Sequence, residues 1–285
     1  MNETRFSSVL SEARELGRAV GAFTCYNLEE LEAVILAAEA RRAPAIVLIS
    51  PSSFRSEGGE RLVRAFRAAA ALASVEVLLQ LDHVSDPTSI ERAAECGVDA
   101  VMADGSKLPF EDNLAFTGTA VQSMQNWRIG VEAELGRVEG QEDRVGEALA
   151  GAMTDPEEAR EFAEKSGVDC LAVAVGNVHG NYSGTPSLDW PRLAKVRSLV
   201  STPLSLHGAS GLPDEDLRRA IPEGIVKTNV NTELRAAYFR RLREELGPSS
   251  DTLDLKRLGD SLTGAVTEVI GVKLDAFGWA VEGPS

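Results

Sequence analysis

The chain has 285 residues, of which 44% are hydrophobic and 26% charged, the balance of an ordinary soluble globular protein. Its formal net charge of −15 argues against a general binder of nucleic acids or anionic membranes, because either would require a positive field. A small anionic substrate is compatible with this charge, since a metal ion or a helix N-terminus outweighs the distant field locally.

Two further features predict a soluble protein of the cytoplasm. The three cysteines, Cys25, Cys96 and Cys170, lie far apart in apolar segments, as reduced thiols do. The N-terminal residues 1–17 lack the apolar core of a signal peptide, and no uncharged apolar run approaches membrane-spanning length.

Short strand-like runs alternate with longer helical ones along the chain. Eight runs are almost continuously apolar, as expected of a parallel sheet covered on both faces, and they span 21–26, 45–50, 75–83, 98–105, 129–136, 168–177, 203–208 and 224–231. Helical spacing of apolar residues follows or separates them, over 28–38, about 58–73, 110–124, 189–200 and 213–220.

Local signals mark where several of these helices begin. Asn27 and Glu30 have the spacing of a capping box. Asp86-Pro87 and Asp155-Pro156 each combine an N-cap residue with a proline at the first helical position.

This alternation predicts βαβ units, and eight strands favour a TIM (β/α)8 barrel, a fold of about 250 residues. An open, doubly wound sheet is the alternative, but the chain offers no dinucleotide fingerprint. We expect one domain over 1–285, with no linker. Helical spacing over 251–273 predicts an extra C-terminal helix that covers a barrel end or joins a subunit interface.

The three histidines of the chain, His83, His179 and His207, each lie at or just after the carboxyl end of a predicted strand. TIM-barrel active sites form at that face. Each histidine alone could be an ordinary hydrogen-bonded residue, but their common position favours a shared task. Three neutral imidazoles are a common ligand set for catalytic Zn²⁺.

Carboxylates cluster on the same side of the predicted barrel. Asp82 precedes the first histidine, Asp104 ends the fourth strand and Glu134 ends the fifth. Ionised groups at apolar strand ends need partners, so Asp82 and Asp104 are candidates for the site. By spacing alone, Glu142 and Asp143 in the following polar loop fit a solvated loop best.

Together these motifs resemble the class II, metal-dependent fructose- and tagatose-bisphosphate aldolases. The matching segments occur in the family's order through nearly the whole chain: GAFTCYNLEELEAVILAAE, LDH, MADGS, VEAELG with GQED, VAVGNVHGNYSGTP, LHGASGLP and VKTNVNTEL.

The resemblance implies a role for each group of residues. It assigns the catalytic zinc to His83, His179 and His207. Glu134 and Asp104 match positions that hold the metal in an alternate, more buried placement. Asp82 matches the acid/base that handles a substrate hydroxyl, and Glu142 matches the loop carboxylate that takes the proton from the carbon beside the ketone. Zinc would serve as a Lewis acid on the ketone oxygen.

The resemblance also implies a substrate site at strand ends and glycine-rich turns, a usual phosphate site in this fold. Its residues are Ser50, Gly180, Gly208, Ser210, Asn229, Asn231 and Thr232. The glycines could instead serve only as turn residues. Some members of the family hold a monovalent cation, Na⁺ or K⁺, near this site.

Three positions depart from the family's pattern, and all concern the substrate. A lysine that usually meets the ketone-side phosphate is replaced by Ser183-Gly184, which should weaken binding by about 1–3 kcal/mol unless another group compensates. Lys256, next to Arg257, stands where an arginine often reaches a neighbouring subunit's phosphate site. Thr24 stands where asparagine is common.

We therefore expect a zinc-dependent aldolase that cleaves a phosphorylated ketose, with fructose 1,6-bisphosphate as the first choice and dihydroxyacetone phosphate and glyceraldehyde 3-phosphate as products. Tagatose bisphosphate or another ketose phosphate is the alternative. A non-catalytic subunit and a metal-dependent isomerase or epimerase also remain open, as does imine chemistry at Lys227. The resemblance suggests a homodimer or homotetramer.

Overall fold

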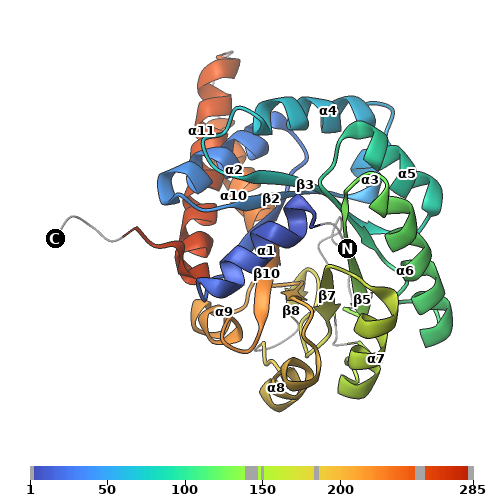
Figure 1. Cartoon of the computed structure of the whole chain (residues 1–285). Helices are drawn as coiled ribbons and strands as arrows, with labels where there is room; N and C mark the ends of the chain where they lie inside the picture. Colours follow the sequence, from blue (N-terminus) through green and yellow to red (C-terminus); the bar gives the residue numbers. More distant parts are fainter. Residues whose placement is uncertain (1–2, 139–146, 149–150, 183–185, 248–253, 282–285) are drawn as a thin grey trace.

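The computed structural model describes residues 3–138, 147–148, 151–182, 186–247 and 254–281. Its centre is a closed barrel of parallel strands, ordered β1-β10-β9-β7-β5-β4-β3-β2 around the ring (Figure 1). The barrel strands are β1 (Val20–Thr24), β2 (Ala45–Ile49), β3 (Val77–Val84), β4 (Ala100–Ala103), β5 (Gly130–Leu135), β7 (Cys170–Val173), β9 (Leu204–Leu206) and β10 (Ile225–Val230). The predicted TIM barrel is confirmed, and each strand lies within or close to its predicted run.

Helices surround the barrel and connect its strands (Figure 1). They are α1 (Arg5–Glu15), α2 (Leu28–Arg41), α3 (Pro51–Phe54), α4 (Gly59–Ala70), α5 (Pro87–Cys96), α6 (Phe110–Gln125), α7 (Pro156–Ser166), α8 (Trp190–Leu199), α9 (Asp214–Ala220), α10 (Thr232–Glu245) and α11 (Leu255–Leu274). Two short strands, β6 (Glu147–Ala148) and β8 (Asn181–Tyr182), pair outside the barrel.

The predicted helix starts are confirmed. The Asn27 side chain accepts a hydrogen bond from the Glu30 amide, and the Glu30 carboxylate accepts from the amides of Tyr26 and Asn27. Asp86 and Asp155 cap α5 and α7, each with a proline in the first turn. These caps satisfy amides that would otherwise lack a partner at a helix start.

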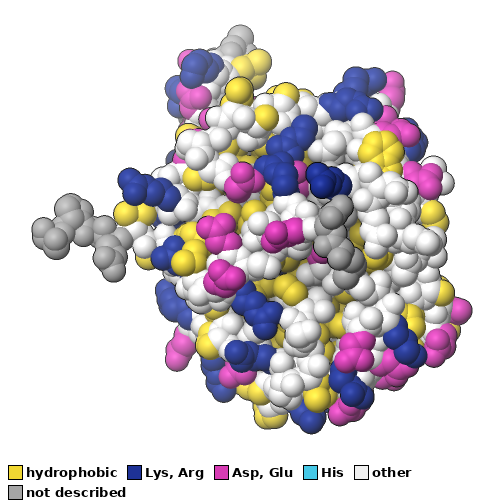
Figure 2. Space-filling view, viewed as in Figure 1, with side chains coloured by type: hydrophobic (Ala, Val, Ile, Leu, Met, Phe, Trp, Pro, Cys, Tyr) yellow, Lys and Arg dark blue, Asp and Glu magenta, His cyan; other side chains and the backbone are white. Residues whose placement is uncertain are grey.

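The N-terminal end of the barrel is closed by α1, a helix that was not among those predicted. Phe6 and Leu10 on this helix are fully buried, and Phe6 lies directly against the backbone of Gly130, the first residue of β5. Figure 2 shows this face of the molecule, where acidic and basic side chains intermingle and none of the three histidines is visible. The three histidines lie at or after the carboxyl ends of β3, β7 and β9, and so they belong to the opposite end of the barrel.

The predicted C-terminal helix is present as α11, but it does not cover a barrel end. It packs on the outer side of the barrel against α2 and α10. After a π-helical turn over Asp275–Trp279, the indole of Trp279 donates a hydrogen bond to the Ala19 carbonyl just before β1. The chain thus returns to the start of the first strand.

Replacing Phe6 by alanine should lower the free energy of unfolding by about 3–5 kcal/mol, because α1 would lose its largest buried side chain and a cavity would remain. Urea unfolding measures this loss. Phe239→Ala is the matched control: that side chain is 47% exposed, so its loss should change stability by less than about 0.5 kcal/mol. Equal effects of the two substitutions would refute the closing role of α1.

All three cysteines are buried and unpaired with one another, as the sequence predicted. In the part of the chain that the structure describes, every helix is too short or too polar to cross a membrane.

Candidate active site

The barrel brings the three histidines together at its carboxyl end. His83 belongs to β3, while His179 follows β7 and His207 follows β9. Nδ1 of His207 lies 3.0 Å from Nε2 of His83, and each histidine offers a ring nitrogen within 4.8 Å of the other two. Residues far apart in the chain thus form one cluster of possible metal donors.

An irregularity in β3 lets two consecutive residues face this cluster. The register with β4 shifts between Leu81 and Val84, and His83 has a φ of 44°. In a regular strand Asp82 and His83 would point to opposite faces. The bulge removes that constraint, and its left-handed backbone is strained for a non-glycine residue, a cost often found at functional sites.

Each histidine also makes a hydrogen bond through the ring nitrogen that faces away from the cluster. His83 Nδ1 lies 2.9 Å from the Asp104 carboxylate, His207 Nε2 lies 2.9 Å from Glu132, and His179 hydrogen-bonds to the backbone of Val138. Since a carboxylate can only accept, the outer nitrogens of His83 and His207 carry the protons. Their inner nitrogens then present lone pairs to one another, which suits a metal ion.

Burial keeps two of the imidazoles neutral. It lowers the pKa of His179 well below its ordinary value, and the neighbouring His83 and His207 lower it further. Burial also lowers the pKa of His207, although Glu132 opposes the shift. Neutral imidazole is the form that binds metals, so the donor set fits a catalytic Zn²⁺ ion.

The two carboxylates proposed for an alternate metal position lie beside His83. Asp104, Glu134 and His83 form a second group of donors within 4.8 Å of one another. Burial raises the pKa of Glu134, and the Asp104 charge adds to this, to about 8. Burial alone would raise the pKa of Asp104 too, but hydrogen bonds from His83 and Ser106 bring it below its ordinary value. Glu134 Oε2 is buried and accepts no hydrogen bond from the described residues.

Asp82 is fully buried next to the histidines. Its Oδ2 accepts a hydrogen bond of 3.1 Å from the side-chain amide of Asn229, whereas no described residue donates to its Oδ1. One oxygen is therefore fixed, and the other can accept a proton or a hydrogen bond from a ligand.

Lys227 does not have the properties of an imine-forming lysine. Its amine is fully buried and pairs with Glu132 at 2.8 Å. Burial lowers the pKa of Lys227, but the charges of Glu132 and Asp82 more than offset this and hold it above its ordinary value. A protonated amine has no lone pair for attack on a ketone.

Six of the seven predicted substrate residues line one hollow together with His179, namely Gly180, Gly208, Ser210, Asn229, Asn231 and Thr232. The φ of Gly208 is 61°, and a Cβ there would collide with the Val178 carbonyl, so only glycine fits. Ser50 is not among these lining residues. It is buried after β2, where its hydroxyl caps α3 and bonds to Ser52 and Ser53.

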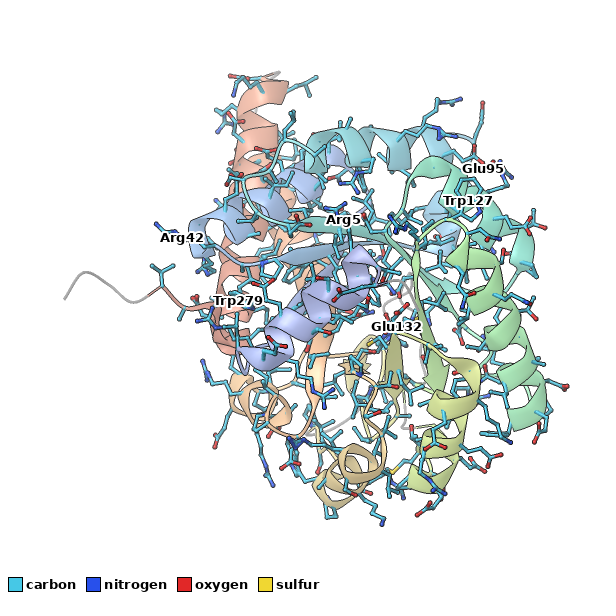
Figure 3. All side chains as sticks on the ribbon, in the orientation of Figure 1. Arg5, Arg42, Glu95, Trp127, Glu132 and Trp279 are labelled. Atoms are coloured by element: carbon cyan, nitrogen blue, oxygen red, sulfur yellow. The ribbon has the colours of Figure 1, made fainter. Side chains whose placement is uncertain are left out.

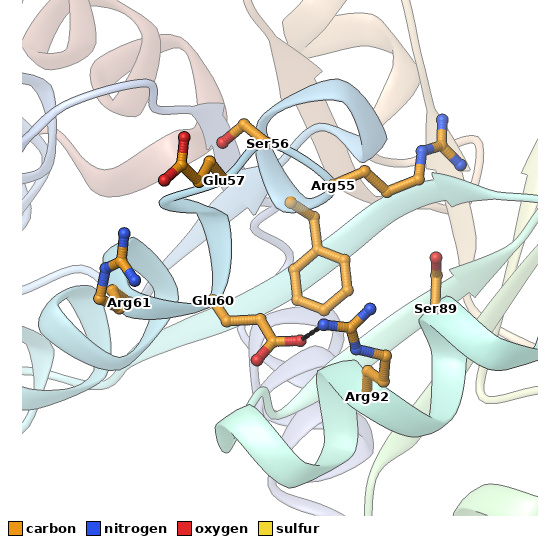
Figure 4. A pocket seen from close by; sticks show the side chains of 8 residues that line it. Arg55, Ser56, Glu57, Glu60, Arg61, Ser89 and Arg92 are labelled. Carbon is orange, nitrogen blue, oxygen red and sulfur yellow. Dashed lines mark ion pairs between the residues drawn. The ribbon is translucent and has the colours of Figure 1, made fainter.

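The hollow beside the histidines is smaller than another hollow on the outside of the barrel. The hollow beside the histidines measures about 10 Å³, whereas a hollow of about 390 Å³ lies among α3, α4 and α5 (Figure 4). Two of the arginines around the larger hollow are paired, Arg92 with Glu60 and Arg55 with Asp86. Its walls hold no histidine, and the groups of possible metal donors among the described residues all lie at the barrel mouth.

Four positions of interest lie outside the described residues: the loop acids Glu142 and Asp143, and Ser183 and Gly184 at the place of the family's phosphate lysine. Thr24 is described. It ends β1 with its hydroxyl buried.

Glu132 was not among the predicted site residues, and neither was the part that Lys227 plays beneath the site. A signal was available, because polar residues repeat every second position on four strands and so face the barrel interior together. These pairs are Gln80 with Asp82, Glu132 with Glu134, Ser205 with His207, and Lys227 with Asn229. Glu132 lies inside the ring of strands (Figure 3).

The lowered pKa values of His179 and His207 should make the stability of the metal-free protein depend on pH. Below about pH 6.5 both imidazoles take up protons more readily in the unfolded chain than in the fold, so their contribution lowers stability as the pH falls. Glu134 opposes this, because its raised pKa keeps a proton on the folded protein. We expect the two histidines together to outweigh the one carboxyl, so that the free energy of unfolding falls as the pH is lowered from 6.5 to 5.5.

Urea unfolding of chelator-treated protein measures this dependence. Glu134→Gln removes the opposing contribution and should make the free energy of unfolding fall more steeply over the same pH range. Stability that is constant, or that increases as the pH falls through this range, would contradict neutral histidines in the fold.

Three convergent imidazoles and adjoining carboxylates thus form a possible metal site at the face where TIM-barrel active sites lie. The family model described as class II fructose-bisphosphate aldolase matches residues 4–281. The D-tagatose-1,6-bisphosphate aldolase subunit GatY of Klebsiella oxytoca is 37% identical over 264 residues, which cover 92% of this chain and 93% of that protein.

Two solved structures are similar over almost their full length. A proposed fructose-1,6-biphosphate aldolase from Coccidioides immitis superposes with a TM-score of 0.90 at 36% identity, covering 98% of both chains. The YdjI aldolase from Escherichia coli K12 gives 0.85 at 32% identity, covering 97% of both.

The chain belongs to the class II fructose-bisphosphate aldolase family. It is accordingly an aldolase, a lyase of carbohydrate metabolism, and family membership implies a phosphorylated sugar as its substrate.

Proposed function

We propose that the protein is a zinc-dependent aldolase that cleaves a ketose 1,6-bisphosphate into dihydroxyacetone phosphate and glyceraldehyde 3-phosphate. The observation that carries this proposal is the arrangement of His83, His179 and His207, with their inner nitrogens convergent and buried Asp82 beside them. These histidines would hold Zn²⁺, with Asp104 and Glu134 available for a second, deeper placement. Bound zinc would polarise the ketone oxygen of the substrate.

Residues of the protein would bind the phosphate and carry out the two proton transfers. The pocket that includes Gly208, Ser210 and Thr232 would hold the ketone-side phosphate through backbone amides and hydroxyls. Asp82 would accept the proton of the hydroxyl on the carbon that becomes the aldehyde, because its Oδ1 is available. Glu142 would move the proton of the carbon beside the ketone, a role that rests on the family resemblance.

Fructose 1,6-bisphosphate is the substrate we test first, and tagatose 1,6-bisphosphate is the second candidate because of the 37% identity to GatY. The products are the same triose phosphates, so one coupled assay compares both sugars. We further propose a homo-oligomer in the cytoplasm, with a role in glycolysis if the fructose substrate is preferred. A monovalent cation, Na⁺ or K⁺, would sit near the phosphate pocket.

Zinc-loaded protein should release triose phosphates from at least one of these sugars, and a chelator should abolish the release. Re-addition of zinc should restore it. Stoichiometric zinc without cleavage of either sugar would contradict the proposed substrates, and a panel of other phosphorylated ketoses would follow. Absence of both zinc binding and cleavage would contradict the metal-dependent mechanism.

A further inference from the structure

Two opposite charges are buried in the barrel directly beneath the histidines. Glu132 on β5 and Lys227 on β10 are both 0% exposed. Burying an ion pair is usually no more stabilising than packing apolar side chains there, so stability alone does not explain its presence. Neither side chain is among the described residues that line the phosphate hollow.

Both carboxylate oxygens of Glu132 have two partners each. Its Oε1 accepts from His207 Nε2 at 2.9 Å and from the Ser205 hydroxyl at 2.5 Å. Its Oε2 accepts from the Gln80 amide at 2.6 Å and lies 2.8 Å from the Lys227 amine. A carboxylate held at four points cannot rotate, so the proton of His207 stays on Nε2 and the lone pair of Nδ1 stays directed toward His83.

Lys227 extends the same network to the opposite side of the site. Its amine also donates to Oδ1 of Asn229 at 2.6 Å, which sets which end of that amide is oxygen and which is nitrogen. The Asn229 nitrogen therefore faces Asp82 and donates to its Oδ2 at 3.1 Å. A flipped amide would place an oxygen against the carboxylate and repel it.

We propose that Lys227 and Glu132 are positioning residues that fix a metal-ligand histidine and the proton-accepting aspartate in one rigid arrangement. Through Glu132 the pair holds the tautomer of His207, and through Asn229 it holds the rotamer of Asp82. This inference rests on the proposed roles of His207 and Asp82, and it assigns Lys227 a task other than imine chemistry.

The test variant is the double substitution Lys227→Met with Glu132→Gln, which removes both charges while keeping similar volumes. A single substitution would leave one buried charge unpaired and endanger folding. Asp99→Asn is the matched control, because Asp99 is a carboxylate with an 8% exposed side chain that pairs with Arg5 and Arg67. It lies just before β4, at the far end of the barrel. Ser205→Ala, which removes one donor to Glu132, is prepared in parallel.

Three quantities are measured: zinc affinity by competition with a chelator, the visible spectrum of the Co²⁺-substituted protein, and kcat and KM per zinc-loaded molecule. In the double variant we expect zinc affinity to fall about 10- to 100-fold, kcat to fall at least about 10-fold with KM little changed, and the Co²⁺ spectrum to shift. Asp99→Asn should lose stability only.

A double variant that folds with the zinc affinity and kcat of the unmodified protein would overturn the proposal, because a merely structural pair predicts that result. If the double variant does not fold, Ser205→Ala decides, since unchanged zinc affinity there would also overturn it. An unmodified protein that neither binds zinc nor cleaves a ketose bisphosphate would instead refute the proposed function.

Discussion

Replacing His207 by alanine is expected to abolish zinc binding and aldol cleavage together. The substitution removes one of three protein ligands, and the two that remain would not hold a catalytic zinc ion in an ordered site. Turnover should fall by at least about 10³-fold, which corresponds to roughly 4 kcal/mol of lost transition-state stabilisation. Zinc content of the purified variant and triose phosphate release measure the two effects on the same sample.

His207 is the best choice among the three histidines because its neighbours tolerate its loss. Glu132 would keep the hydroxyl of Ser205, the amide of Gln80 and the amine of Lys227, so no buried charge would be left alone. Cys96→Ala on α5 is the control, a buried substitution away from the donor cluster that should retain zinc and activity. Substantial chelator-sensitive activity in His207→Ala would contradict the assignment of this ligand.

Most of the barrel could be predicted from the sequence because its signals are local. Eight apolar runs and capped helix starts such as Asp86-Pro87 depend on neighbouring residues alone. The helix α1 also has a local signal, because Phe6, Val9, Leu10 and Ala13 follow one another at helical spacing, but its closing role depends on Phe6 meeting Gly130 across a long stretch of chain. The bulge at His83 likewise results from the register between β3 and β4, which no local pattern displays.

The site was predictable to the extent that its residues mark strand ends. His83, His179 and His207 stand out because the chain has no other histidine, and the structure brings them together as expected. Glu132 and Lys227 are charged residues inside apolar strands, and their purpose appears only when their partners on other strands are known. The proposed role of Glu142 remains a prediction from the family resemblance.

Changing Asp82 to asparagine is the second substitution with a large expected effect. The amide has nearly the same volume as the buried carboxylate, but it cannot take up the hydroxyl proton of the substrate. We expect kcat to fall about 10²- to 10⁴-fold, while zinc content stays stoichiometric because Asp82 is not among the three histidine donors. Asp169→Asn, which changes a carboxylate just before β7 that accepts from the Val131 amide, should leave kcat unchanged.

Asp82 and Glu142 are proposed to move different protons of the substrate. The Asp82→Asn variant can therefore test the two roles separately. Exchange of the carbon-bound hydrogen of dihydroxyacetone phosphate with deuterated solvent needs the zinc site and the carbon base, but it needs no proton transfer to the aldehyde-derived oxygen. Asp82→Asn should therefore keep this exchange near the rate of the unmodified protein while cleavage is lost. If exchange and cleavage fall by the same factor, Asp82 acts on the carbon proton as well, or it holds the metal site in place, and the separate roles proposed for the two carboxylates are wrong.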